Sequence, residues 1–216
     1  MRSASVGAGA VLAVAALLTS CSSGDGGGDT APKGAAAAEV CEGFAGDAPA
    51  AAALRAVMGA ERFTDDLSEP EEALDGLRDA TRVPRADTYR PRPLTYCRLL
   101  PAEGGTTDLA VELGTAAKAP GLRPEHAGTV TSYTSGLQAF SSSGIGRLYF
   151  SCRLPAPAHG IVVETVVRGP AGVPDGDLEQ RTRLITLANA AARQVSAELG
   201  CAGDGLAPGV PAGTTG

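Results

Sequence analysis

The sequence predicts an α+β fold: an antiparallel sheet of about four to five strands packs against N-terminal helices and a long C-terminal helix, in two layers stapled by disulfides. Apolar residues recur at helical spacing near both ends of the chain and alternate with period two between residues 94 and 168. Four widely spaced cysteines favour covalent cross-links between these elements: Cys41, Cys97, Cys152 and Cys201.

Two helices are predicted at the front of the domain. Asp47 or Ala48 begins the first, and Gly59 ends it. The capping-box pattern of Ser68 and Glu71 begins the second, whose first turn is acidic. Three prolines then favour extended chain: Pro84, Pro91 and Pro93.

Strands follow where the hydrophobic period changes to two. The four candidates are residues 94–100, 108–113, 147–154 and 161–168. Gly104 and Gly105 favour a short antiparallel connection between the first two. A structureless loop over 116–146 would be unusual in a compact domain, so a further strand is expected around 130–140.

The last helix has the clearest signals at both ends. Asp177 with Gln180 resembles a capping box, and Gly200 stands where a helix commonly terminates. The apolar positions at helical spacing are Leu178, Ile185, Ala188, Ala192, Val195 and Leu199. This helix is expected to lie across the sheet.

The N-terminus has the pattern of an export signal. Arg2 is a short basic region, and residues 6–18 form an apolar stretch too short to span a bilayer. The Leu-Thr-Ser-Cys sequence at 18–21 resembles the lipobox of bacterial lipoproteins. This resemblance implies cleavage between Ser20 and Cys21, with a diacylglyceryl group on the Cys21 sulfur. The competing interpretation makes Cys21 a fifth disulfide cysteine, which leaves one cysteine unpaired.

The predicted domain organisation follows from these signals and from composition. The segments are a lipoprotein signal peptide (1–20), a flexible Gly/Ala/Ser tether (21–38), a single globular α+β domain (39–202) and a disordered tail (203–216). The formal net charge of −6 repels nucleic-acid phosphate and anionic lipid headgroups. We therefore expect the lipid to hold the protein at the extracytoplasmic face of the membrane, with no nucleic-acid partner.

An exported chain meets an oxidising environment, so the four remaining cysteines predict two disulfides. Their spacing fits neither a CxxC redox motif nor a zinc site. Four cysteines allow three pairings. We favour Cys152 with Cys201, because the end of the last helix could approach the inward face of the strand that carries Cys152. Cys41 with Cys97 is then the other pair.

No group of residues has the pattern of a catalytic or metal site, and no cofactor is predicted. His126 and His159 lie among Pro and Gly with no companion ligand. The serines at 141–143 lack the Gly-x-Ser-x-Gly elbow and indicate a turn. The acidic residues at 175–179 lack a calcium-loop pattern and suit a helix start. The serines are Ser141, Ser142 and Ser143, and the acidic residues are Asp175, Asp177 and Glu179.

An acidic run at residues 65–79 precedes several arginines. Such segregation could form an anion site beside an acidic face, but a solvated helix with charges arranged along its dipole is the favoured interpretation. The arginines are Arg78, Arg82, Arg85, Arg90 and Arg92.

Several features together resemble uncharacterised actinobacterial, Streptomyces-type secreted lipoproteins of unknown function. The residues that carry the resemblance are the lipobox, Met58, Gly59, Glu61, Arg62, Phe63, Cys97, Cys152 and the Glu198-Leu199-Gly200-Cys201 end. It implies no catalytic residues. We therefore predict a non-enzymatic, lipid-tethered domain that binds a small ligand or an envelope protein. The alternatives are an envelope hydrolase with paired carboxylates, for which Glu112 and Glu164 are candidates, and an accessory solute-binding lipoprotein.

Overall fold

The computed structural model describes residues 33–82, 92–126 and 128–214, which belong to one compact unit. The predictions for the signal peptide, Ser20, Cys21, Pro84 and Pro91 lie outside these residues. The helices are η1 (Cys41–Gly43), α1 (Ala48–Met58), α2 (Pro70–Arg82), η2 (Pro124–His126) and α3 (Leu178–Leu199). The strands are β1 (Ala35–Ala36), β2 (Arg62–Thr64), β3 (Leu94–Pro101), β4 (Leu109–Ala116), β5 (Thr131–Thr134), β6 (Gln138–Ser141), β7 (Ile145–Cys152), β8 (Ile161–Arg168) and β9 (Ala212–Gly213).

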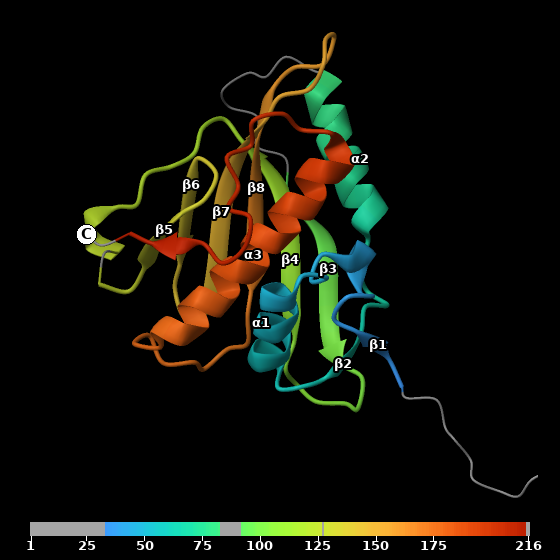
Figure 1. Ribbon diagram of the computed structural model, residues 1–216, viewed down its shortest axis with the longest axis vertical. Coiled ribbons are helices and arrows are strands. Elements are labelled where there is room, and N and C mark those ends of the chain that lie inside the picture. Colours follow the sequence, from blue (N-terminus) through green and yellow to red (C-terminus); the bar gives the residue numbers. More distant parts are fainter. Residues whose placement is uncertain (1–32, 83–91, 127, 215–216) are drawn as a thin grey trace, which may run out of the picture. The chain divides into compact units, whose positions relative to one another are not determined.

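The strands form one sheet in the order β1-β2-β3-β4-β8-β7-β6-β5-β9, with antiparallel pairing between neighbours (Figure 1). The α+β class is confirmed, but the predicted strand number of four to five is too small. Four predicted strands are the eight-residue strands β3, β4, β7 and β8. The further strand expected around 130–140 is a pair of four-residue strands, β5 and β6. The remaining strands, β1, β2 and β9, have two or three residues, too few for a period of two to stand out from the sequence.

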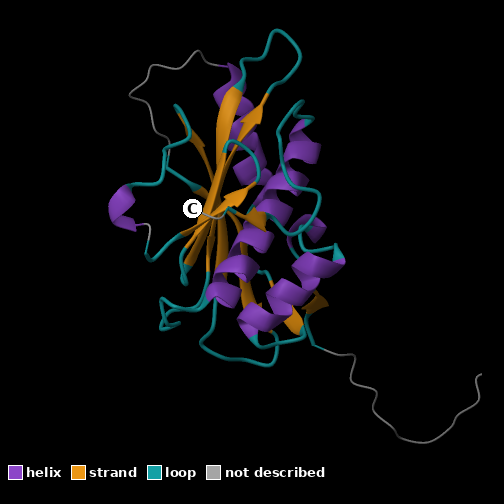
Figure 2. Cartoon of the chain, turned by 60° about the vertical axis from the view of Figure 1, so that its left-hand side comes forward, coloured by secondary structure: helices purple, strands orange, loops and turns teal. Residues whose placement is uncertain are grey.

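The three α-helices lie on one face of the sheet (Figure 2). α3 packs on β6, β7 and β8, α2 packs on β3 and β4, and α1 packs against α3. Because side chains alternate along a strand, Leu148, Phe150 and Cys152 point into this interface and are fully buried. The residues between them on β7 point to the helix-free face.

Helix ends follow the predicted capping chemistry in α1 and α3. Asp47 Oδ1 accepts the Ala50 N–H at 2.8 Å, and Asp177 Oδ1 accepts the Gln180 N–H at 2.8 Å. Gly200 adopts φ +71°, a left-handed conformation that suits glycine at the end of α3.

Two details of the helix predictions are wrong. Ser68 does not cap α2, which begins at Pro70; the Ser68 hydroxyl instead accepts the backbone N–H of Arg98 at 2.8 Å. Leu178 was placed on the apolar face of α3 but is 63% exposed, because it stands at the first position, where the helix extends beyond the sheet. At both positions the surroundings of the residue in the folded domain, and not the local sequence pattern, decide what its side chain contacts.

Both disulfides join the helix-side layer to the sheet. Cys41 bonds Cys97 of β3, and Cys152 of β7 bonds Cys201 after α3. These are the two pairs favoured from the sequence. The second bond closes α3 onto the strand whose inward face already carries the core.

Both flanks of the domain differ from the sequence-based expectation. The tether was expected to reach residue 38, but Ala35 and Ala36 pair with β2. The tail from residue 203 was expected to be disordered, but residues up to 214 are described and β9 pairs with β5. Buried Asn189 explains the order, since its amide nitrogen donates to the Ala207 and Gly209 carbonyls, both at 2.9 Å.

Candidate functional site

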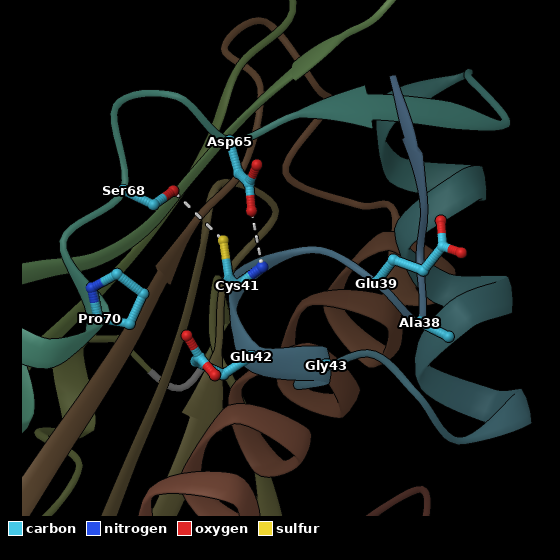
Figure 3. A pocket seen from close by; sticks show the side chains of 8 residues that line it. All are labelled: Ala38, Glu39, Cys41, Glu42, Gly43, Asp65, Ser68 and Pro70. Carbon is cyan, nitrogen blue, oxygen red and sulfur yellow. Dashed lines mark hydrogen bonds between the residues drawn. The ribbon is translucent and has the colours of Figure 1, made fainter. Parts of the chain in front are cut away.

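Two hollows flank the segment that connects β1 to α1. We call the first the acidic hollow; its volume is about 500 Å³ (Figure 3). Its lining residues are Ala38, Glu39, Cys41, Glu42, Gly43, Asp65, Ser68 and Pro70. We call the second, of about 650 Å³, the interhelix cavity. It is lined by Gly43, Phe44, Gly46, Asp47, Ala190, Arg193, Gln194, Ser196, Ala197, Gly200, Cys201, Asp204, Leu206 and Pro208.

The acidic hollow is built around a tight backbone turn. Cys41 and Glu42 adopt φ of 46° and 60°, left-handed values that cost non-glycine residues on the order of 1–3 kcal/mol each. Asp65 Oδ2 compensates by accepting the Cys41 N–H at 2.8 Å (Figure 3). The Ser68 hydroxyl lies 3.3 Å from Cys41 Sγ and is the donor, because a disulfide sulfur carries no hydrogen. These contacts explain how the turn and the disulfide are held, and they provide no nucleophile–base pair.

The interhelix cavity brings together three segments that are distant in sequence: the chain before α1 up to its cap Asp47, the second half of α3 and the chain after α3. Arg193 joins all three, since its Nη1 donates to Asp47 Oδ2 and to the Pro208 carbonyl, both at 2.9 Å. The pair is partly exposed, at 39% for the Arg193 side chain and 35% for that of Asp47. The Arg193 side chain is therefore partly accessible to solvent.

Asp204 is an acidic residue that lines the same cavity. It accepts hydrogen bonds from the Ser196 hydroxyl and from the Leu206 N–H, the latter at 3.1 Å. Ser196 stands three residues after Arg193 on α3, so Arg193 and the residue that binds Asp204 lie on neighbouring turns of the helix.

The predicted paired carboxylates lie on the helix-free face of the sheet. Glu112 is held by Arg168 Nε at 3.0 Å, and Glu164 is held by Arg147 Nη1 at 3.0 Å. Glu112 stands opposite Val166 in the β4–β8 register, which makes it a diagonal neighbour of Glu164. Each carboxylate thus has its own arginine partner, an arrangement that suits a structural ion pair.

Tyr149 completes the Glu164 cluster. Its hydroxyl donates to Glu164 Oε1 at 2.6 Å, and its ring lies 6.3 Å from that of Phe140. Burial of the phenol, followed by the hydrogen bond to Glu164, raises the pKa of Tyr149 to about 12. The phenol therefore stays protonated at neutral pH and acts as a donor that orients the carboxylate.

The other residues considered from the sequence do not assemble into a site. His126 and His159 are exposed. The serines form the β6–β7 turn, in which the Ser142 N–H donates to the Ile145 carbonyl at 2.9 Å. In the acidic group before α3, Asp175 accepts the Ser143 hydroxyl at 3.1 Å. Within the described parts of the chain, no three His, Cys, Asp or Glu residues are grouped to hold a metal ion.

The acidic and basic residues of α2 form ion pairs with one another along the helix. Arg78 contacts Asp75 at 2.8 Å, and Arg82 contacts Asp79 at 2.5 Å, both at i,i+3 spacing. Their side chains are largely exposed, as expected for a solvated helix. Arg85 and Arg90 lie outside the described residues.

Sequence reasoning missed the interhelix cavity. It identified Asp47 only as a helix cap, and it did not single out Arg193 or Asp204. Arg193 and Asp47 are 146 residues apart, and no local pattern signals that they meet. The one available hint was Asp204, an acidic residue in a segment otherwise rich in Gly, Ala and Pro.

No family model, curated protein or solved structure matches the chain. The site is therefore interpreted from its geometry alone. The described helices include none with the length and apolar character required to cross a bilayer.

Proposed function

We propose that this chain is a lipid-anchored protein of the extracytoplasmic membrane face, whose domain binds a small ligand without transforming it. The lipobox-like sequence that ends at Cys21 supports the anchor, and the two disulfides are compatible with an oxidising compartment. Eleven residues, Ser22 to Pro32, separate the proposed acylation site from the first described residue. A segment of that length reaches at most about 40 Å, so the domain would work close to the bilayer.

The interhelix cavity is the observation that carries the binding proposal. Its volume of about 650 Å³ falls within the range of small-molecule sites, roughly 300–1,000 Å³. Its lining combines an apolar floor, including buried Phe44, with a few charged groups. That combination of apolar area and convergent polar groups is typical of ligand sites.

The hydrolase alternative is less well supported by the geometry. Paired catalytic carboxylates must both face the bound substrate, whereas a carboxylate bonded to an arginine of a neighbouring strand is already engaged in a structural contact. Glu112 and Glu164 each have such a partner. Neither residue lines one of the two hollows.

The anchor is tested by mass spectrometry of the mature N-terminal peptide and by membrane fractionation. We expect an acylated N-terminal Cys21, and we expect a Cys21→Ser form to leave the membrane fraction. An unmodified N-terminus further along the chain would contradict the anchor.

Ligand binding is tested with the full chain extracted from its native envelope and analysed by native mass spectrometry. Ala197→Trp places an indole in the interhelix cavity and should remove any co-purifying small molecule. Leu178→Trp is the matched control, on the same helix at a 63% exposed position. Equal ligand occupancy in both variants would refute the cavity as the binding site.

A further inference from the structure

We infer that residues 203–214 form a detachable strap that retains the ligand of the interhelix cavity, with Asn189 and Ser135 as its latch. The inference rests on the proposed binding function and adds how the same site opens and closes. It follows from the way in which this segment is attached to the rest of the domain.

The strap is one wall of the cavity. Asp204, Leu206 and Pro208 belong to the strap and line the cavity, together with residues of the chain before α1 and of the end of α3. The disulfide of Cys201 fixes the chain just before the strap to β7. From there the strap runs back from the end of α3 to the β5 edge of the sheet (Figure 1). Undocking of the strap therefore removes one wall of the cavity, while the disulfide keeps the end of α3 in place.

The strap is attached mainly through its main chain. Between residues 205 and 213, the hydrogen bonds from the rest of the described domain all end on main-chain atoms of the strap. The bonds are Gly136 N–H to the Gly205 carbonyl, Arg193 Nη1 to the Pro208 carbonyl, those of Asn189 and Ser135, and the β9–β5 ladder. Within the strap only Pro211 is buried. A segment with so few buried apolar contacts opens at a lower free energy than the core, so the strap opens while the core stays folded.

The latch is a pair of buried polar side chains. The Ser135 hydroxyl donates to Asn189 Oδ1 at 2.6 Å and accepts the Ala207 N–H at 3.0 Å. Asn189 Nδ2 donates to the Ala207 and Gly209 carbonyls, both at 2.9 Å. Buried polar groups require partners, and the docked strap supplies them to both side chains. The Ser135 hydroxyl takes part in two of these bonds, so its removal should loosen the strap.

Ligand retention follows by linkage. A ligand that fills the cavity contacts the wall formed by the docked strap, and it loses those contacts when the strap opens. The ligand therefore binds the docked state more tightly and favours it. By reciprocity, a change that favours the open strap lowers the affinity for the ligand.

The first test is hydrogen exchange of the detergent-solubilised full chain, measured at the Thr214 amide, which donates to the Ser132 carbonyl at 2.9 Å. Ser135→Ala should speed the exchange of this amide about tenfold, because two bonds of the latch are lost. Amides in the middle of α3 should exchange as in the unaltered chain. Thr214 lies seven residues beyond Ala207, so an effect confined to the lost bonds would not reach its amide.

Two further variants separate the strap from the latch. Gly205 has φ of +71°, a conformation that alanine disfavours, and a Cβ there would approach no atom closer than 3.7 Å. Gly205→Ala should therefore loosen the strap without altering the latch and speed exchange at Thr214 at least about threefold. Ser151→Ala is the matched control, because Ser151 is a half-buried serine of β7 that bonds no strap residue, and it should leave this exchange unchanged.

The second test is native mass spectrometry of the same variants extracted from the native envelope. Ser135→Ala and Gly205→Ala should carry several-fold less co-purifying small molecule than Ser151→Ala, because an open strap lowers the affinity. Faster exchange at Thr214 with equal occupancy in all three variants would overturn the inference, since the strap would then open without releasing the ligand.

Failure of the strap inference and failure of the proposed function give different results. If Thr214 exchanges as slowly as the middle of α3 and neither strap variant speeds it, the strap is not detachable, and the comparison of Ala197→Trp with Leu178→Trp still decides the binding function. If no small molecule accompanies even the unaltered chain, the proposed function falls and the strap has no ligand to retain.

Discussion

The two faces of the sheet are made by the same strands but are stabilised differently. On the helix-covered face, the inward residues of β7 and β8 are apolar except for Thr165 and are almost fully buried, and both disulfides lie there. On the helix-free face, the alternating residues include Arg147, Glu164 and Arg168, which pair across strands. Successive residues of one strand therefore lie on opposite faces of the sheet, one stabilised mainly by hydrophobic burial and the next by ion pairing.

This contrast indicates where stability resides. Burial of a Val or Leu side chain contributes about 1.5–3 kcal/mol, whereas a partly exposed ion pair contributes about 0.2–1 kcal/mol. The helix-covered face should thus determine whether the domain folds. The helix-free face is free to vary in charge at little cost.

The largest expected effect comes from breaking the covalent link on the covered face. Replacing Cys152 and Cys201 together by Ser opens a loop of 49 residues and should lower the free energy of unfolding by about 4 kcal/mol. Chemical denaturation of the double variant measures it. A loss below about 1 kcal/mol would show that the unfolded chain is scarcely constrained by this bond.

Adjacent valines on β8 provide the sharpest comparison of the faces. Val163→Ala creates a void in the fully buried layer and should cost about 2–3 kcal/mol. Val162→Ala, on the opposite face and half-buried, should cost less than about 1 kcal/mol. Equal losses in urea melts would mean that the helix-free face is covered as tightly as the other.

Alkaline pH should act on the helix-free face through Tyr149. Its pKa is about 12 in the folded protein, and an unfolded tyrosine has a pKa of about 10, so the unfolded chain releases the proton first. The stabilisation is complete below pH 10 and is lost as the pH rises toward 12, at up to about 1.4 kcal/mol per pH unit. Thermal melts at pH 9 and 11 should show a smaller decline for Tyr149→Phe than for the unaltered chain; parallel declines would contradict the assignment.

The smallest effect is expected for the Arg168–Glu112 pair. Arg168→Gln should cost less than about 1 kcal/mol, because the arginine side chain is 48% exposed and solvent screens the pair. Salt at 1 M should reduce the difference between the variant and the unaltered chain. A decrease in the free energy of unfolding of more than about 2 kcal/mol would contradict this prediction, because it would show that the ion pair contributes as much as a buried apolar side chain.

Local chemistry explains which elements could be predicted. α3 begins after Asp177 and ends before Gly200, as its capping residues indicate, because capping bonds form between neighbours in sequence. β8 matches its predicted bounds because the segment is rich in β-branched residues, which favour extended chain. Ser68 also belongs to a capping-box pattern, but its hydroxyl accepts a hydrogen bond from the Arg98 N–H of β3 and does not cap α2.

Short pairings and long-range contacts could not be predicted in the same way. β1 and β9 have two residues each, and each forms only because an edge of the larger sheet is available to pair with it. The chain after Gly203 looks disordered by composition, yet the buried amide of Asn189 requires the carbonyl acceptors that this segment provides.

The amino-acid sequence alone determined the ends of α1 and α3 and the four long strands, because each depends on residues within a few positions of one another. Only the tertiary structure decided that Asp47, Arg193 and Asp204 line one cavity. Convergence of that kind depends on how α1, α3 and the C-terminal segment pack, and packing is set by the whole core rather than by any local pattern.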